Sequence, residues 1–319
     1  RVGGATQVGK GVYTHFLDEK GGIRADLTIV RLSEDCFRVI CGGGTGHRDL
    51  VWIKQMAAAR HADIEIHNRT HQLATLGLWG PNARKVLASL VDDPNAVSDA
   101  KFPFATAANI EIEGIKIWAF RISYVGELGW ELYFDFADGL QLWDLFADAG
   151  VNPVGIETYA NSRRLEKSLR LQNADLETDY NLHEADLARK LVKKADFHGK
   201  AAYVAQKAAD QQASYLCTMV MLKNVDASGV ARYPVGEWPI LNKETREVLL
   251  DELGRRSICT SVEYGPSLGS NIILGYIPAE FASVGTELLL EYFCEEYPIR
   301  IEAVGYAPLL DPENLRVRS

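Results

Sequence analysis

The chain has 319 residues, 47% hydrophobic and 24% charged, which is ordinary for a soluble globular protein of two or three compact units. Its net charge of -9 and isoelectric point near 5.4 argue against a nucleic-acid surface or an anionic-membrane surface, since both need clustered lysine and arginine. No apolar run reaches the roughly 18 residues of a membrane helix.

The cysteines are five in number and scattered, with no Cys-x-x-Cys pair. This pattern suggests neither a disulfide framework nor a zinc site, so we expect a reducing compartment, either the cytoplasm or, in a eukaryote, the mitochondrial matrix. The chain begins at Arg1 without a methionine and without a charged-then-apolar leader, so we expect it to be a piece of something longer.

The first patterned segment, residues 11 to 41, alternates short apolar runs with turns around Gly21-Gly22. This predicts a three-stranded meander. Asp26 lies at the entrance of the second strand, where an aspartate is more often a turn or cap residue.

A glycine-rich run, Cys41 to Asp49, leads into a predicted helix. Such a loop can cradle an anion, but the spacing matches neither the dinucleotide nor the P-loop fingerprint. Further on, His61, His67 and His71 raise the question of a metal, although no converging cysteine or carboxylate pattern accompanies them. Loop histidines are the favoured interpretation, and no metal site is predicted.

The stretch from Arg121 to Tyr133 reads as strand, tight turn and strand, with Gly126 and Gly129 free to take positive φ. Glu127 and Glu131 lie four residues apart, so both can face one side of extended backbone. A fixed carboxylate there could accept two parallel N–H bonds from a planar ligand. Two glutamates on a hydrated hairpin are the alternative.

The segment Tyr124 to Glu131 resembles the Tyr-x-Gly-Glu-x-Gly-x-Glu motif of the glycine-cleavage T-protein (aminomethyltransferase) family, which binds tetrahydrofolate. Val125 stands where a threonine is usual. In that family the last glutamate grips the pterin ring, which implies Glu131, with Glu127 and Tyr124 as further folate-binding candidates. A pterin presents an amino group beside a ring N–H, the donor pair that a carboxylate accepts side by side.

Two other segments resemble the same family. Gly21 to Leu27 is similar to its Gly-Gly-x-x-x-Asp-Leu segment, which implies that Asp26 faces the reacting nitrogens of folate and is catalytic, although Ala25 replaces a second aspartate. Ser162 to Lys167 is similar to its Ser-Leu-Arg-Leu-Glu helix, which implies Arg164 in the folate site. A surface ladder of ion pairs is the alternative for this helix.

The remaining pattern completes an α+β fold. Ala195 to Tyr203 starts a helix and resembles the family's Asp-Phe-Ile-Gly segment, and from Tyr215 onward short strands follow at regular spacing. We predict a T-protein-like folate-binding region of antiparallel sheets with helices over residues 1–212, in two interleaved subdomains, and a small antiparallel β-barrel over residues 213–319.

The resemblance implies transfer of a one-carbon unit to tetrahydrofolate from an aminomethyl or iminium donor, forming 5,10-methylenetetrahydrofolate. Details such as the ending Pro308 to Asn314 look more like the folate domain of dimethylglycine and sarcosine dehydrogenases. The expected partners are a small-molecule amine donor and either a flavin oxidoreductase domain or a lipoyl carrier protein, with no nucleic acid and no membrane. No dinucleotide fingerprint appears, so no flavin is expected on this chain.

Two other functions remain open from the sequence. One is a folate-dependent demethylase that takes methyl from sulfur or oxygen. The other is a non-catalytic folate-binding regulatory protein. Relatives of the second kind tend to lose the aspartate, so Asp26 counts mildly against it.

Overall fold

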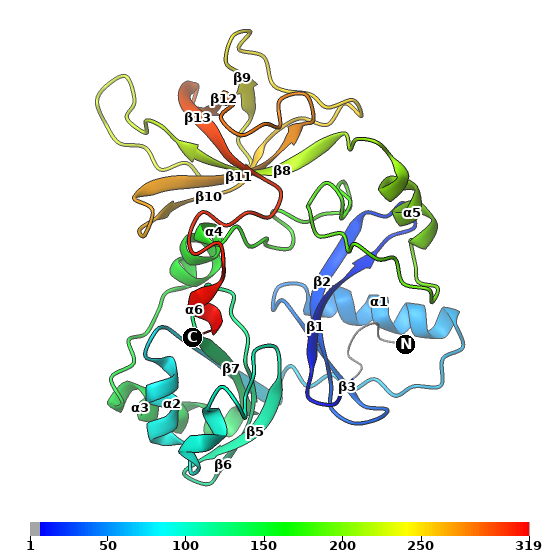
Figure 1. Ribbon diagram of the computed structural model, residues 1–319, viewed down its shortest axis with the longest axis vertical. Helices are drawn as coiled ribbons and strands as arrows, with labels where there is room; N and C mark the ends of the chain where they lie inside the picture. Colours follow the sequence, from blue (N-terminus) through cyan, green and yellow to red (C-terminus); the bar gives the residue numbers. More distant parts are fainter. Residues whose placement is uncertain (1–6, 319) are drawn as a thin grey trace. The chain divides into compact units, whose positions relative to one another are not determined.

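The computed structural model describes residues 7–318, so the start of the chain at Arg1 lies outside the described residues. The chain forms two compact units (Figure 1). The first holds the residues up to His15, Ala25–Val154 and the end of the chain from Asn314, and the second holds Phe16–Arg24 and Gly155–Glu313. The division at residue 212 stays a prediction.

The first sheet has three strands in the order β1-β2-β3. They are β1 (Gly11–Leu17), β2 (Ile23–Arg31) and β3 (Phe37–Cys41), and they confirm the predicted meander. Helix α1 (Gly46–Ala59) follows the glycine-rich run, as expected. Asp26 lies inside β2, so it is neither a turn residue nor a cap residue.

The second sheet belongs entirely to the first unit and has four antiparallel strands. In spatial order they are β4 (Leu73–Trp79), β7 (Gly129–Asp135), β6 (Ile115–Phe120) and β5 (Ala107–Ile112). One face of this sheet is covered by a hydrophobic core that includes residues of α2 (Ala83–Leu90), η1 (Pro94–Val97) and α3 (Gly139–Asp148). A single turn, η2 (Phe136–Asp138), precedes α3.

The predicted hairpin from Arg121 to Tyr133 is wrong in its first arm, because residues 121–128 form a loop between β6 and β7. The hydroxyl of Ser123 accepts the N–H groups of Val125 and Glu127, and such local bonds compete with a strand ladder. Gly126 has the expected positive φ of 75°. Gly129 is needed for a different reason, since a Cβ there would lie 2.0 Å from a backbone oxygen of β4.

The second unit contains a curled antiparallel sheet of six strands in the order β10-β11-β8-β13-β12-β9. Their bounds are β8 (Ser214–Met221), β9 (Ile240–Asn242), β10 (Cys259–Gly265), β11 (Ser270–Pro278), β12 (Glu287–Tyr292) and β13 (Glu295–Val304). A bridge between Pro239 and Ile258 joins the two edge strands, which curls the sheet towards closure. The short strands predicted from Tyr215 onward are present.

The helices of the second unit are shorter than expected. The segment Ser162 to Lys167, expected to be helical, lies in a π turn, η3 (Thr158–Arg163), and in α4 (Arg164–Glu166), which ends before Ser168 with its positive φ of 53°. Helix α5 (Lys200–Ala208) begins after Gly199, whose φ is 77°. The last helix, α6 (Leu315–Arg318), belongs to the first unit.

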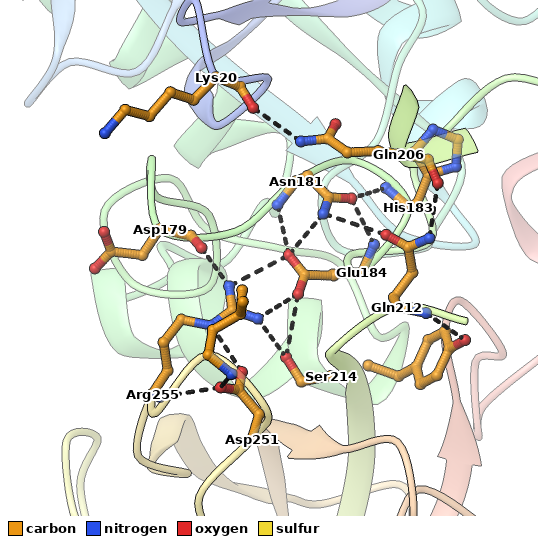
Figure 2. Close-up of polar contacts among 12 residues, drawn as sticks. Lys20, Asp179, Asn181, His183, Glu184, Gln206, Gln212, Ser214, Asp251 and Arg255 are labelled. Atoms are coloured by element: carbon orange, nitrogen blue, oxygen red, sulfur yellow. Dashed lines mark hydrogen bonds and ion pairs between the residues drawn. The ribbon is translucent and has the colours of Figure 1, made fainter. Parts of the chain in front are cut away.

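A polar network ties the irregular segments of the second unit to its barrel (Figure 2). The buried carboxylate of Glu184 accepts bonds from the guanidinium of Arg255, from the backbone and side chain of Asn181, and from the hydroxyl of Ser214. Arg255 also pairs with Asp251 at 2.7 Å. Both oxygens of the Glu184 carboxylate therefore have donors that replace the water they lost.

We expect Arg255→Met to lower the free energy of unfolding by about 3 to 5 kcal/mol, because it would leave the Glu184 carboxylate buried without a cation. Lys243→Met is the matched control, since Lys243 pairs with Glu287 where both side chains are well exposed. That control should unfold at nearly the wild-type urea concentration. Equal losses in the two variants would show that burial does not set the strength of these pairs.

Candidate functional site

The first sheet places Asp26 on a defined face. In the β2–β3 pairing Val30 lies opposite Arg38, and Thr28 lies opposite Ile40. Side chains alternate along a strand, so Asp26, Thr28 and Val30 share a face, and Arg38 projects from the same face of β3.

The second sheet places Glu131 in the same way. Glu131 lies opposite Phe120, and Tyr133 lies opposite Trp118. These four side chains therefore share one face of the β6–β7 ladder. The other face carries Trp130 and Leu132 and is covered by the hydrophobic core.

These two faces meet within the first unit. The guanidinium of Arg38 lies 4.0 Å from the centre of the Trp118 ring. A Cβ on Gly11 would lie 2.4 Å from the ring of Phe120 and 3.3 Å from Val30, so the two sheets approach here as closely as a glycine allows. Asp26 and Glu131 are thus brought to the facing sides of two packed sheets.

The half-buried carboxylate of Glu131 accepts a hydrogen bond of 2.5 Å from the hydroxyl of Tyr133. Burial raises the pKa of Glu131, and the bond from Tyr133 lowers it in part. On the neighbouring strand Gly77 lies opposite Glu131, and the ring of Trp79 lies over the place of its missing side chain. Aromatic rings around one carboxylate suit a flat ligand that brings N–H donors.

Asp26 is held by Tyr13, whose hydroxyl donates to it at 2.9 Å. Burial raises the pKa of Asp26, the bond from Tyr13 lowers it, and the nearby charge of Asp49 raises it again. Asp49 is itself buried and accepts bonds from Thr45 at 2.7 Å and from Arg48 at 3.2 Å. The glycine-rich run therefore delivers a second carboxylate, on α1, to the surroundings of Asp26.

Glu127 and Tyr124 lie in the loop before β7. The carboxylate of Glu127 accepts a bond of 2.9 Å from Arg316 of α6, so its partner differs from that of Glu131. Tyr124 is half-buried. Folate binding by these two residues stays a prediction.

Arg164 belongs to the second unit and is completely buried. Its guanidinium pairs with Asp175 at 2.5 Å and donates to the hydroxyl of Ser261 at 2.6 Å and to the carbonyl of Ala160 at 2.8 Å. The alternative of a surface ladder is therefore wrong for Arg164. Its assignment to the folate site stays a prediction.

No group of three or more histidine, cysteine or carboxylate side chains that could hold a metal ion is found within residues 7–318. Near the three loop histidines, His67 lies 3.1 Å from Glu65 alone. The same described range contains no helix that is long and apolar enough to cross a membrane.

Three contacts of this site were not found from the sequence: those of Tyr13, Arg38 and Tyr133. Tyr133 lies two residues from Glu131 on β7, whereas Tyr13 and Arg38 lie on other strands than the carboxylates they approach. Alternation along the strands would have placed them, but the pairing register that selects the face is a tertiary property.

The fold combines two antiparallel sheets, which bear carboxylates on their facing sides, with a curled six-stranded sheet later in the chain. Comparison with known protein families identifies the class of protein that has this arrangement. Residues 4–195 match the family described as GCVT N-terminal domain, and residues 235–304 match the glycine cleavage T-protein C-terminal barrel domain. The chain therefore belongs to the glycine cleavage T-protein family.

Curated relatives fall into two groups. The chain is 34% identical over 291 residues to dimethylglycine dehydrogenase, mitochondrial, of Homo sapiens, covering 89% of this chain and 31% of that protein. The rat protein of that name is 34% identical over 311 residues, covering 96% and 34%. The chain thus spans about a third of the length of these relatives. An aminomethyltransferase of Listeria monocytogenes serotype 4b is 30% identical over 285 residues, covering 88% and 72%.

A solved structure shows the same fold. The crystal structure of glycine cleavage system aminomethyltransferase T from Bartonella henselae superposes with a TM-score of 0.78 at 22% identity. The match covers 96% of this chain and 77% of that chain. The predicted α+β architecture of antiparallel sheets, helices and a barrel is confirmed.

Glu131→Gln should flatten the dependence of stability on pH. Because burial raises the pKa of Glu131 in the folded chain, its contribution to the free energy of unfolding falls as pH rises from the ordinary value of 4.5 through the folded value. The wild type should lose stability across this interval relative to Glu131→Gln, measured by urea unfolding from about pH 4 to about pH 8. Glu111→Gln, at an exposed position of β5, is the control, and parallel curves for wild type and Glu131→Gln would contradict the assignment.

Proposed function

We propose that this chain transfers a one-carbon unit to tetrahydrofolate from an aminomethyl or iminium donor, forming 5,10-methylenetetrahydrofolate. The observation that carries the proposal is the half-buried Glu131 carboxylate among aromatic rings, on a sheet face turned towards the face that bears Asp26. Membership in the glycine cleavage T-protein family supports it, as do the aminomethyltransferases and dimethylglycine dehydrogenases among the relatives.

The residues present fit a pterin. A buried carboxylate with a raised pKa is stabilised by a ligand that donates hydrogen bonds, and a pterin offers an amino group and a ring N–H side by side. Tyr133 occupies one oxygen of Glu131 and fixes its direction. The rings of Trp79, Phe120 and Tyr133 lie on the same sheet face as the carboxylate, which suits a flat heterocycle. Bound tetrahydrofolate would supply N5 as the nucleophile that accepts the one-carbon unit.

In this proposal each carboxylate has a separate task. Glu131 orients the ligand, and this orientation lowers the entropic cost of bringing the reacting atoms together. Asp26 stabilises positive charge on nitrogen and accepts the proton that the nucleophile loses. Its raised pKa brings it closer to neutral pH, where such a group both takes and returns a proton.

The proposed donor is a small-molecule amine derivative, delivered by a flavin oxidoreductase domain or by a lipoyl carrier protein. The two groups of relatives, dimethylglycine dehydrogenases and aminomethyltransferases, support this proposal. The described cysteines are all free, which agrees with a reducing compartment, and we propose the cytoplasm or the mitochondrial matrix.

Glu131→Ala should weaken the binding of tetrahydrofolate by about 2 to 4 kcal/mol, the scale for losing a desolvated, charge-assisted pair. Calorimetric titration of the chain with tetrahydrofolate measures this directly. Glu111→Ala, at an exposed position of the same sheet, is the matched control and should bind as the wild type does. Wild-type affinity in Glu131→Ala would place the pterin elsewhere, and no binding by the folded wild type would refute a folate site on this chain.

Asp26→Asn should spare folate affinity but reduce turnover by roughly 100-fold or more, because the amide neither accepts the proton nor balances the cation. The assay supplies a flavin dehydrogenase partner with dimethylglycine and measures 5,10-methylenetetrahydrofolate. Asp35→Asn, at an exposed position of the loop between β2 and β3, is the control. Equal turnover in Asp26→Asn would remove Asp26 from the mechanism, and 5-methyltetrahydrofolate as product would indicate a demethylase.

A further inference from the structure

Arg38 carries an unsatisfied donor at the candidate site. Its guanidinium lies 4.0 Å from the ring centre of Trp118 and 5.8 Å from that of Tyr133. Its Nη1 is buried and has no hydrogen-bond partner among the residues that the structure describes. Buried guanidinium donors are normally paired, so this one calls for an acceptor.

The surroundings of Arg38 do not supply that acceptor. None of the ion pairs described within residues 7–318 includes Arg38. Burial lowers the pKa of Arg38, Tyr133 opposes this in part, and the nearby charge of Arg69 lowers the pKa further. Tyr133, the adjacent polar side chain, donates its hydroxyl to Glu131. A cation that is stacked, partly desolvated and next to a like charge is a place where an external oxygen atom binds favourably.

The strand register places the guanidinium of Arg38 between the sheet face that bears Asp26 and the face that bears Glu131, the predicted acceptor of the pterin N–H groups. Arg38 projects from the same face of its sheet as Asp26, and it contacts the face that bears Glu131. Tyr133 connects the two, since its ring contacts Arg38 and its hydroxyl bonds to Glu131. An acceptor and a donor therefore both lie near one tyrosine, and a planar ligand that reaches both would need an N–H group next to a carbonyl group.

We propose that Arg38 is a specificity-determining residue that donates to the ring carbonyl oxygen of a pterin, next to the ring N–H that Glu131 accepts. A pterin carries this pair at N3 and C4, and the inference rests on the proposed function. Glu131 and Arg38 together then recognise a lactam edge and discriminate against rings that present an amino group in place of the carbonyl. An amino group would leave the Arg38 donor unsatisfied and place two donors face to face.

A purely structural role of Arg38 predicts a different effect of replacing it on ligand affinity. If Arg38 only joins the two sheets by stacking on Trp118, its replacement changes stability and weakens all pterins alike. The 4-amino ring differs from the 4-oxo ring at two neighbouring groups, since the amino group at C4 also removes the hydrogen from N3. Glu131 therefore contributes to the wild-type preference, and the contribution of Arg38 is the change in that preference when Arg38 alone is replaced.

The test compares the affinities of tetrahydrofolate and of its 4-amino analogue, tetrahydroaminopterin, by calorimetry. The wild type is expected to favour the 4-oxo compound by about tenfold or more, and Arg38→Gln is expected to reduce this preference by at least about threefold, since its amide presents either a donor or an acceptor. Arg31→Gln is the matched control. Arg31 also stacks on an aromatic ring, that of Phe37, but its donors are bound to the carbonyls of Ser33 and Glu34.

The outcomes distinguish a failure of the proposed role of Arg38 from a failure of the proposed function. Failure of the wild type to bind tetrahydrofolate refutes the proposed function. Binding with an unchanged preference in Arg38→Gln, or no preference in the wild type, overturns the role of Arg38 and leaves the folate site standing. If thermal unfolding shows that Arg38→Gln does not fold, Arg38→Lys keeps the charge over Trp118 and loses the planar fork, and its preference should fall by at least threefold.

Discussion

The packing of two antiparallel sheets inside the first unit is the constraint on which the candidate site depends. Gly11 has no side chain at the point of contact, and the guanidinium of Arg38 lies 4.0 Å from the ring centre of Trp118, so the strands come close enough to desolvate the groups between them. Two carboxylates, Asp26 and Glu131, sit on these facing sides with raised pKa values. The fold thus holds acids where an isolated chain would leave them in water.

The buried charges of the second unit follow the opposite rule. Arg164 meets Asp175 with zero exposure on either side chain, and Glu184 receives Arg255 together with neutral donors. These networks are nearly complete, which is what a buried ion pair needs in order to avoid a large desolvation penalty. At the candidate site of the first unit, the buried Nη1 of Arg38 has no hydrogen-bond partner among the described residues, and a ligand could supply one.

Motif and periodicity identified much of this protein. The Tyr124 to Glu131 segment indicated the family and named Glu131, and the alternation of apolar residues gave the meander and all six strands of the curled sheet. They failed for residues 121–128, where Ser123 turns the backbone locally, and for the helix beyond Glu166, where the chain reverses. In both places a local hydrogen bond or a positive φ overrode a plausible pattern.

The sequence by itself determined which residues are candidates for the chemistry and where most strands lie, because alternation, turn residues and a spaced motif are properties of neighbours along the chain. Only the tertiary structure decided that Tyr13 holds Asp26, that Tyr133 holds Glu131 and that Arg38 stands beside Tyr133 with an unsatisfied donor. These contacts depend on strand register and on the approach of two sheets. A shift of one residue in register would turn every one of these side chains to the other face.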